Sequence, residues 1–430
     1  MQSAVLCADI GTSSLKAALI SPEGDVFAFE RIRFDSICQN KKEASPKLWF
    51  DAFCEASLRL TSSKNDTTKI LGICISGNGP TVASENGQFL LWNIPLKLDK
   101  KDFSLIKDAG LEDSLFLPRI LMFKKKFPDF WEKSNWIFSG PEQLIWQLTG
   151  RALTILPEKR FANAYWNPES AAKIGIEANK IPPFVFQGEF AGNILEQVAL
   201  NCNLPFGTPV FCGGPDFSVA LIGTGTVQPG IICDRAGSSE GLNLCIGINP
   251  KEFVEKNDLD LRVLPSVVSD FYNASYLIPD SGVCFSQFKS KVAPNLTYNE
   301  FVQTLLESHN KFIQGRQLMK KIALQVKNGL DQLEKLSQYD KIQRNDTRPF
   351  EKKIITSGGQ AKNNLWLQYK SNITGYKIEV TSCPDAELMG NAILAYRSLG
   401  FFKTLEQGIS NMVKVSNVFI PNENTEQTAL

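Results

Sequence analysis

Two glycine-containing segments place acidic, hydroxyl and basic side chains where they could handle phosphate or move a proton. The first begins at Asp9 and continues, after one residue, with Gly11, Thr12, Ser13, Ser14 and then Lys16. Glycine allows a close approach of the backbone, and consecutive amides form a concavity that binds phosphate oxygens. The carboxylate could hold a hydrated divalent cation, and the lysine adds positive charge. The pattern alone also fits an ordinary turn.

The second segment, Gly213-Gly214-Pro215-Asp216, follows an apolar run. Two glycines allow a tight bend at the end of a strand and leave the aspartate accessible. Asp216 could then accept a proton from a substrate hydroxyl as a general base. It could equally cap the helix that follows. Both interpretations stay open on these residues alone.

Residues 237–241 match the G-x-S-x-G pattern of serine hydrolases, but we reject that function. The nucleophilic serine of such an elbow needs a histidine base. The sequence has one histidine, His309, which we expect in a helix over residues 299–314 and exposed. The chain also contains neither a G-x-x-x-x-G-K-[ST] loop nor a strand-linked G-x-G-x-x-G, which excludes the common P-loop and Rossmann sites.

The single histidine and the scattered cysteines exclude several further classes of site. Ser-His-Asp and Cys-His catalysis, zinc sites rich in histidine and the two-His-one-carboxylate iron site all require imidazole ligands or bases. The ten cysteines include no C-x-x-C pair. Several lie in apolar runs, which predicts small buried side chains in a reducing compartment. Carboxylates, backbone amides and a hard cation remain as the groups that could carry out the chemistry.

The composition is that of an ordinary water-soluble protein of more than one domain. The 430 residues are 43% hydrophobic, and 46 basic residues balance 45 acidic ones. This balance predicts no nucleic-acid partner and no affinity for an anionic membrane. No apolar run approaches the length of a membrane span, and the first residues lack the pattern of a signal peptide. We therefore expect a cytoplasmic protein.

Apolar periodicity predicts an α/β fold. Short apolar runs predict strands over residues 4–10, 15–20, 26–29 and 70–75, with turns at 11–14 and 22–25. Apolar residues at three- and four-residue spacing predict a helix over 46–60. Strands in this order with an intervening helix indicate a mixed sheet covered by helices.

A second block repeats the first. Strands are expected over residues 209–212, 231–236, 242–246 and 352–356, and helices over 316–338 and 386–399. Residues 10–13, Ile-Gly-Thr-Ser, align with residues 236–239, Ala-Gly-Ser-Ser, and apolar strands flank both. Two such hairpins indicate two similar domains.

Five segments in a fixed order carry a resemblance to a known family. They are Asp-Ile-Gly-Thr-Ser-Ser-Leu-Lys (9–16), Gly-Gly-Pro-Asp (213–216), Ala-Gly-Ser-Ser (236–239), Ser-Gly-Gly-Gln-Ala-Lys-Asn-Asn-Leu-Trp (357–366) and Glu-Leu-Met-Gly-Asn-Ala (387–392). The chain resembles the FGGY carbohydrate kinases of the actin, Hsp70 and hexokinase superfamily, xylulose and glycerol kinases in particular. The resemblance implies two ribonuclease-H-like (actin-type ATPase) domains, with mixed sheets flanked by helices around a central cleft. Residues 1–223 would form the sugar-side domain and residues 224–424 the nucleotide-side domain.

The resemblance also implies roles for single residues and for ATP and Mg²⁺ as cofactors. Asp9 would orient magnesium through its water shell, and Asp216 would take the proton from the sugar hydroxyl. The β- and γ-phosphates would lie against the two hairpins, at Gly11, Thr12, Ser13, Ser14 and Lys16 in the first and at Gly237 and Ser238 in the second. The adenosine would be bounded by Gly358, Gly359 and Asn363. The expected partner is a sugar or polyol, for instance a ketopentose such as xylulose, and a homodimer is a candidate assembly.

The sugar side departs from the family pattern. Asn78-Gly79-Pro80 stands where xylulose kinases carry Met-His-Gly, and the segment after Trp92 lacks their aspartate and arginine. Arg235 occupies the position in the second hairpin that matches Asp9. Two hypotheses follow: an active kinase of altered specificity, or a catalytically degenerate nucleotide-binding sensor or scaffold. The retention of Asp9 and Asp216 favours the kinase.

Overall fold

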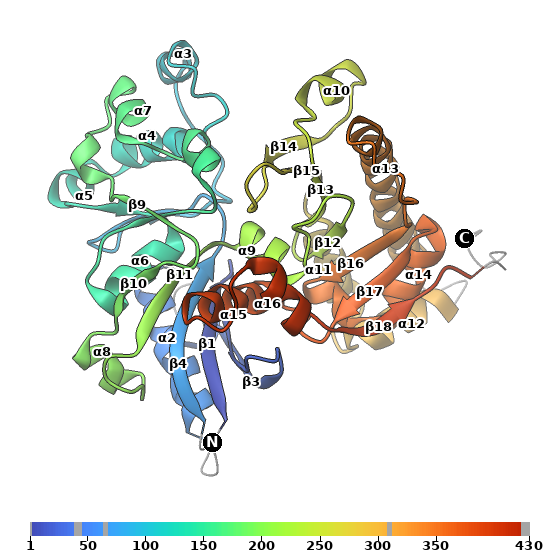
Figure 1. The fold of residues 1–430 in the computed structure, drawn as a ribbon, viewed down its shortest axis with the longest axis horizontal. Coiled ribbons are helices and arrows are strands. Elements are labelled where there is room, and N and C mark those ends of the chain that lie inside the picture. Colours follow the sequence, from blue (N-terminus) through green and yellow to red (C-terminus); the bar gives the residue numbers. More distant parts are fainter. Residues whose placement is uncertain (1, 38–44, 63–67, 308–311, 423–430) are drawn as a thin grey trace. The chain divides into compact units, whose positions relative to one another are not determined.

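The chain forms two compact units, each built on its own sheet (Figure 1). The computed structural model describes residues 2–37, 45–62, 68–307 and 312–422. The first unit comprises Met1–Gly223 and Glu387–Met412, and the second comprises Thr224–Ala386 and Val413–Leu430. This corrects the predicted division at one place, because residues 387–412 belong to the first unit and not to the domain predicted over 224–424.

The sheet of the first unit has six strands in the order β10-β11-β4-β1-β2-β3. β1 pairs antiparallel with β2 and parallel with β4, so the sheet is mixed as predicted. The predicted strands are present, and the third extends to Arg33, beyond its expected end. The bounds are β1 Ser3–Ile10, β2 Ser14–Ile20, β3 Val26–Arg33, β4 Lys69–Gly77, β10 Phe190–Asn193 and β11 Pro209–Pro215.

Helix α2 (Pro46–Thr61) covers part of this sheet. It begins where the side chain of Ser45 accepts a hydrogen bond from the Leu48 amide, with proline at the first helical position, where the missing N–H costs least. Trp49 and Phe53, both fully buried, lie on its sheet-facing side. The spacing of apolar residues thus produces the helix predicted over residues 46–60.

The sheet of the second unit has seven strands in the order β14-β15-β13-β12-β16-β17-β18. The bounds are β12 Ile232–Ala236, β13 Glu240–Ile246, β14 Arg262–Pro265, β15 Tyr272–Ile278, β16 Lys353–Ser357, β17 Lys377–Thr381 and β18 Val415–Phe419. β12 pairs antiparallel with β13 and parallel with β16, which confirms the hairpin and the strand predicted here.

Five strands of each sheet follow one plan. The order β3-β2-β1-β4-β11 in the first unit is matched by β15-β13-β12-β16-β17 in the second. The first two pairings are antiparallel and the last two are parallel in both. The residues aligned in the sequence, 10–13 and 236–239, therefore lie at the same turn of two equivalent hairpins.

The long helix α13 (Ile313–Gln343) packs on the second sheet. Its buried residues include Ile322, Val326 and Leu330, as the apolar stripe predicted. One expectation was wrong: a single helix over 299–314 does not form. Helix α12 ends at Glu307, and Phe312 has a positive φ of 55° that breaks the helical path before α13. His309 lies outside the described residues.

The remaining elements surround these sheets. They include the helices α6 Gly140–Thr149, α8 Glu196–Asn201, α9 Asp216–Gly223, α11 Ser281–Val292, α12 Tyr298–Glu307, α14 Asn364–Thr374, α15 Ala386–Ser398 and α16 Leu405–Met412. The others are α1 Phe34–Ile37, β5 Val82–Ser84, β6 Phe89–Leu90, α3 Lys100–Asp108, α4 Leu117–Lys126, α5 Pro128–Lys133, β7 Ile137–Phe138, β8 Thr154–Leu156, η1 Lys159–Asn163, α7 Pro168–Lys173, η2 Ala178–Lys180, β9 Phe184–Phe186, α10 Lys251–Lys256 and η3 Gly359–Lys362.

The cysteines and the helices agree with the composition. Nine cysteines lie in the described part of the chain and are free thiols, and seven of them are buried, as expected of small apolar side chains. Cys38 lies outside the described residues. No helix within the described ranges has the length and hydropathy needed to cross a membrane.

Candidate active site

Asp9 lies near the end of β1, in the interior of the first unit, with 3% of its surface exposed. In the strand register it stands opposite Lys16 on β2 and beside Ser76 on β4. Directly opposed residues of neighbouring strands point to the same face of a sheet. The Ser76 hydroxyl donates a hydrogen bond of 2.8 Å to Asp9 Oδ1. Two neighbouring strands therefore fix this carboxylate.

Further acidic side chains surround Asp9. The ammonium of Lys16 lies 3.7 Å from a carboxylate oxygen of Glu387, at the start of α15. Burial, together with the negative charges of Glu387 and Asp216, raises the pKa of Asp9 to about 7, against the lowering effects of Lys16 and Ser76. Three carboxylates and one lysine therefore interact here, with negative charge in excess.

The chemistry of these donors fits a cation held through water. Among the residues that the structure describes, no group of three or more histidine, cysteine or acidic side chains is placed to hold a metal ion directly. Magnesium in phosphoryl-transfer sites keeps several waters and is bound by one or two carboxylates together with substrate phosphates. A buried carboxylate with a raised pKa, such as Asp9, is the group that a nearby cation would return to its ionised form.

Glycines turn strand β11 directly into helix α9, which begins at Asp216. A Cβ on Gly213 would lie 2.3 Å from both the Ile75 carbonyl oxygen and Asn391 Oδ1, so a larger residue does not fit. Gly214 has a φ of +102°, which favours glycine. Asp216 is half-buried at the first position of the helix. The glycines thus position Asp216, whose charge acts on Asp9.

Helix α15 brings two residues to this cluster that the sequence did not identify as site residues. Glu387 pairs with Lys16, and Asn391 is fully buried. The Asn391 amide donates hydrogen bonds to the Ala8 carbonyl at 3.0 Å and to Ser76 Oγ at 2.9 Å. Both belong to the segment 387–392 that carried the family resemblance, which was the available signal.

The tip of the first hairpin is a short turn. The Gly11 amide donates to the Ser14 carbonyl at 2.9 Å, and the Ser13 carbonyl accepts a bond of 3.1 Å from the Phe34 amide. Ser13 is exposed and Ser14 is buried. Thr12 Oγ1 accepts a hydrogen bond of 3.1 Å from the Trp92 indole. The turn therefore presents Thr12 and Ser13 more than Ser14.

Arg119 fixes the segment that carries Trp92, a role that no sequence signal indicated. Its guanidinium donates to the carbonyls of Leu91, Trp92 and Ile94, and burial lowers its pKa. Close by in the fold, the Asn78 amide N–H donates to the Ile10 carbonyl at 2.9 Å. The side-chain Nδ2 of Asn78 is buried and has no hydrogen-bond partner among the described residues.

The second hairpin has a similar turn. The Gly237 amide donates to the Ser239 carbonyl at 3.0 Å, and Gly237 and Ser238 are exposed. The start of α11 packs against the turn, because a Cβ on Gly282 would lie 2.0 Å from the Gly237 carbonyl oxygen. The G-x-S-x-G match lies in this strand-turn-strand and not in the strand-turn-helix of a hydrolase elbow, in line with its rejection.

The predicted adenosine residues lie next to this hairpin. Gly358 has a φ of +88°, and a Cβ there would lie 2.7 Å from the Ala236 carbonyl oxygen. A Cβ on Gly359 would meet nothing within 4 Å. Asn363 is buried, and its side chain accepts from the Trp366 amide at 2.9 Å and donates to the Tyr298 carbonyl at 3.3 Å. Asn363 therefore caps α14, a structural role that the sequence did not predict.

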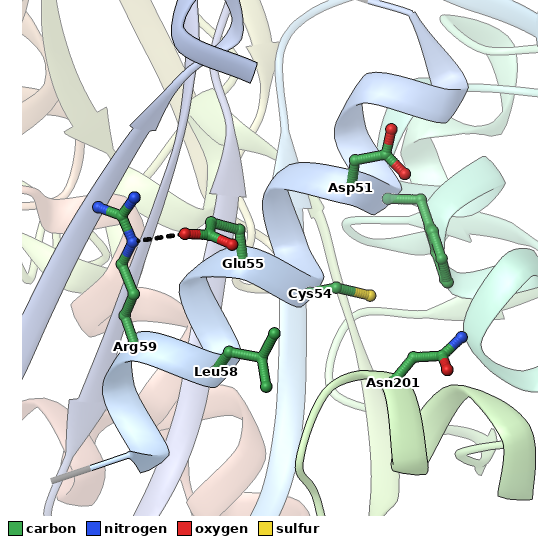
Figure 2. A pocket seen from close by; sticks show the side chains of 7 residues that line it. Asp51, Cys54, Glu55, Leu58, Arg59 and Asn201 are labelled. Carbon is green, nitrogen blue, oxygen red and sulfur yellow. Dashed lines mark hydrogen bonds and ion pairs between the residues drawn. The ribbon is translucent and has the colours of Figure 1, made fainter. Parts of the chain in front are cut away.

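A pocket elsewhere in the first unit has no part in this arrangement. It lies at α2 and α8 and is lined by Phe50, Asp51, Cys54, Glu55, Leu58, Arg59 and Asn201 (Figure 2). None of the predicted site residues lines it.

Comparisons with known proteins show similarity to carbohydrate kinases. The model of the FGGY family of carbohydrate kinases, C-terminal domain, matches residues 294–399. Curated xylulose kinases of Staphylococcus epidermidis and Bacillus subtilis are 24% and 23% identical to the chain, over 97% and 98% of its length and 92% and 94% of their own. Residues 294–399 thus match the C-terminal domain of FGGY carbohydrate kinases, and nearly the whole chain is similar to xylulose kinases.

Solved structures of this family share the fold over nearly the whole chain. A ligand-bound xylulose kinase from Lactobacillus acidophilus has a TM-score of 0.74 at 17% identity and covers 98% of this chain and 94% of its own. A glycerol kinase from Plasmodium falciparum with ADP has a TM-score of 0.71 at 16% identity, with 99% and 96% covered. At these identities the likeness establishes the fold, and the predicted α/β architecture of two helix-flanked mixed sheets is confirmed.

We expect the substitution Asp9→Asn to stabilise the protein at pH 8 in the absence of magnesium and nucleotide. The folded-state pKa of Asp9 is raised from 3.8 to about 7, so its contribution to stability is lost as pH rises through that window. Removing the charge should raise the free energy of unfolding by up to about 4 kcal/mol at pH 8 and by little near pH 4. Urea unfolding at both values measures this.

The half-exposed Asp51, which pairs with Lys47 at the surface, supplies the control. Asp51→Asn should leave the free energy of unfolding nearly unchanged at both pH values. An Asp9→Asn protein that is less stable than wild type at pH 8 would show that the ionised carboxylate is already compensated in the free protein.

Proposed function

We propose that the protein transfers the γ-phosphate of ATP to a hydroxyl group of a sugar or polyol, with a ketopentose such as xylulose as the first candidate. The observation that carries the proposal is the cluster of Glu387, Asp216 and Lys16 around Asp9. Phosphoryl transfer requires positioning and charge neutralisation more than covalent chemistry. Carboxylates, a cation and amide-rich turns supply both without histidine.

The phosphates would bind at the two hairpin turns. Gly11, Thr12 and Ser13, with Lys16 behind them, would bind the phosphates from the first unit, and Ser14, which is buried, would support the turn. Gly237 and Ser238 would bind them from the second. Their exposed turns offer backbone N–H groups to phosphate oxygens. Gly358 and Gly359 would bound the adenosine, with Asn363 holding the helix behind them.

A magnesium ion would complete the charge balance. Asp9 would hold it through water, and Glu387 and Asp216 would contribute negative charge around it. When bound, the ion would neutralise charge on the β- and γ-phosphates. The raised pKa of Asp9 supports this role, because the free protein lacks the positive charge that would keep all three carboxylates ionised.

Asp216 would act as the general base. As it accepts the proton of the attacking hydroxyl, a bond forms between the acceptor oxygen and the γ-phosphorus, and the bond from the γ-phosphorus to the bridging oxygen of ADP breaks. Asp216 stands at the first position of α9, just beyond Pro215 and the two glycines that allow the strand to turn into this helix.

The residues expected near the acceptor support a specificity different from that of the family's common members. Asn78 replaces a family motif residue, and its buried Nδ2 is free to donate a hydrogen bond to a hydroxyl of the acceptor. Trp92 is held beside the first hairpin. The names of the similar xylulose kinases favour a ketopentose.

The similarity to FGGY kinases supports a cytoplasmic location, and a homodimer remains a prediction that sedimentation can test.

A screen of acceptors tests the function. Release of ADP from Mg-ATP would be measured with ketopentoses, hexuloses, polyols and sugar acids. Acceptor-dependent ADP release by one class would support the kinase and name its substrate. Measurable ATP binding with no acceptor-dependent release across the panel would favour the sensor or scaffold, which the altered residues 78–80 and the segment after Trp92 also allow.

We expect Asp216→Asn to reduce kcat for the acceptor by a factor of about 10² or more while ATP affinity changes by less than a few-fold, because a general base acts in the transition state. A coupled ADP assay and a direct ATP titration measure the two effects. Turnover like that of wild type would rule out Asp216 as the base.

We expect Gly359→Leu to weaken ATP binding and leave sugar binding unchanged. A Cβ at this position meets nothing in the protein within 4 Å, so the fold should tolerate the substitution while the ligand would not. Gly358→Leu is the matched control, because its positive φ and the nearby Ala236 carbonyl should make the fold itself unstable. A folded Gly359→Leu protein with unchanged ATP affinity would remove this residue from the nucleotide site.

A further inference from the structure

A charged cluster lies in the core of the second unit, beneath the loops assigned to the nucleotide. Lys370 on α14, Asp234 on β12 and Glu240 on β13 are all fully buried, with 0% of each side chain exposed. The Lys370 ammonium donates to Asp234 Oδ2 at 2.9 Å and to Glu240 Oε1. It also lies 5.4 Å from the centre of the Trp366 ring.

Such a cluster is expensive to bury. One cation and two carboxylates leave an excess of negative charge. Burial, together with the charge of Glu240, raises the pKa of Asp234 to about 7, and Asp234 Oδ1 has no hydrogen-bond partner among the described residues. Replacing buried ion pairs by well-packed apolar residues is often neutral or stabilising. A contribution to the stability of the fold therefore does not explain why this cluster is present.

The first unit shows that the fold does not require it. In the matching hairpin, Ala8 has the position of Asp234 relative to the turn glycine. Leu15 has the position of Glu240 in the strand pair nearest the turn. Both are fully buried. The same strands therefore form around an apolar interior in one unit and a charged one in the other.

The cluster connects the two nucleotide loops of the second unit. Glu240 directly follows the turn 237–239, and Gln360 directly follows Gly359. The Gln360 amide donates to Glu240 Oε2 at 3.4 Å, and its oxygen accepts from Lys370 at 3.5 Å and from the Trp366 indole at 2.6 Å. Lys370 thus contacts the residue that follows each loop.

We propose that Lys370, with Asp234 and Glu240, is a positioning group that sets the spacing between the phosphate turn and the adenosine loop. It does not touch the ligand. Directional charge-assisted hydrogen bonds hold Glu240 and Gln360 at defined points, which apolar contacts would not do. The inference rests on the proposed nucleotide site and adds the reason why a costly buried cluster is present there.

The test is a triple substitution that copies the first unit: Asp234→Ala and Glu240→Leu with Lys370→Met. Because all three charges leave together, no unpaired charge remains, and the melting temperature should stay within a few degrees of wild type or rise. The Kd for Mg-ATP, measured by calorimetry, should increase about tenfold or more, since displaced binding groups lose affinity steeply. The KM for the sugar should change little.

Two further variants separate the outcomes. Gln360→Leu removes the link between the loops while keeping the three charges, and it should also raise the Kd for Mg-ATP. Asp340→Asn is the matched control, because Asp340 is a buried carboxylate of the same unit that binds the Gly247 and Ile248 amides and Arg344, outside the cluster. It should lower stability without changing ATP affinity.

Triple and Gln360→Leu proteins that fold and bind Mg-ATP within twofold of wild type would overturn the inference and leave the proposed function standing. If the triple variant fails to fold, an unchanged Kd for Mg-ATP in the Gln360→Leu protein alone overturns the inference. If wild type itself binds no Mg-ATP, the proposed function fails, and the positioning role fails with it.

Discussion

The site depends on negative charge that the fold concentrates and the protein alone does not balance. β1, α9 and α15 bring Asp9, Asp216 and Glu387 into one electrostatic environment, and Lys16 offsets only part of it. Like charges at short range in a poorly solvated interior are costly unless a proton or a cation reduces them. In the free protein, this unbalanced negative charge contributes to the raised pKa of Asp9. In the complex, Mg-ATP would reduce the repulsion between the carboxylates.

The late return of the chain to the first unit makes this arrangement possible. Helix α15 follows all strands of the second sheet except β18 in sequence and yet supplies Glu387 and Asn391 to the first unit. Gly390 allows this close approach, because a Cβ there would lie 2.0 Å from the Val219 carbonyl oxygen of α9. Three residues of the segment 387–392 thereby have a role: Glu387 supplies charge, Gly390 allows the contact and Asn391 donates hydrogen bonds.

Local patterns were sufficient to predict most of the fold. Strand and helix positions follow from apolar periodicity, and the repeated Gly-hydroxyl turn predicted the two equivalent hairpins. The helix over 299–314 was wrong because Phe312, an apolar residue that fits the helical pattern, adopts a positive φ. The placement of residues 387–412 was wrong because no local signal tells which of two similar sheets a helix will cover.

The candidate site was predictable only in part, for the same reason. Asp9, Asp216 and the turn glycines stand out locally. Glu387, Arg119 and the Lys370 cluster act through contacts with residues far away in the sequence. A single sequence does not show which distant residues come into contact. Asn363 shows the opposite case: a residue singled out for the ligand has its side chain engaged in capping a helix. The similarity to FGGY kinases indicates the chemistry, and the particular contacts of this chain shape how it would be carried out.

Hydrogen exchange measured with and without a non-hydrolysable ATP analogue, in the presence and absence of magnesium, tests directly whether both turns bind the phosphates and whether a cation balances the charge near Asp9. We expect the analogue with magnesium to slow exchange at both turns, residues 11–14 and 237–239, and at residues 358–360. Omitting magnesium should weaken the effect at the first turn most. Protection confined to one unit, or identical protection without the metal, would contradict this expectation.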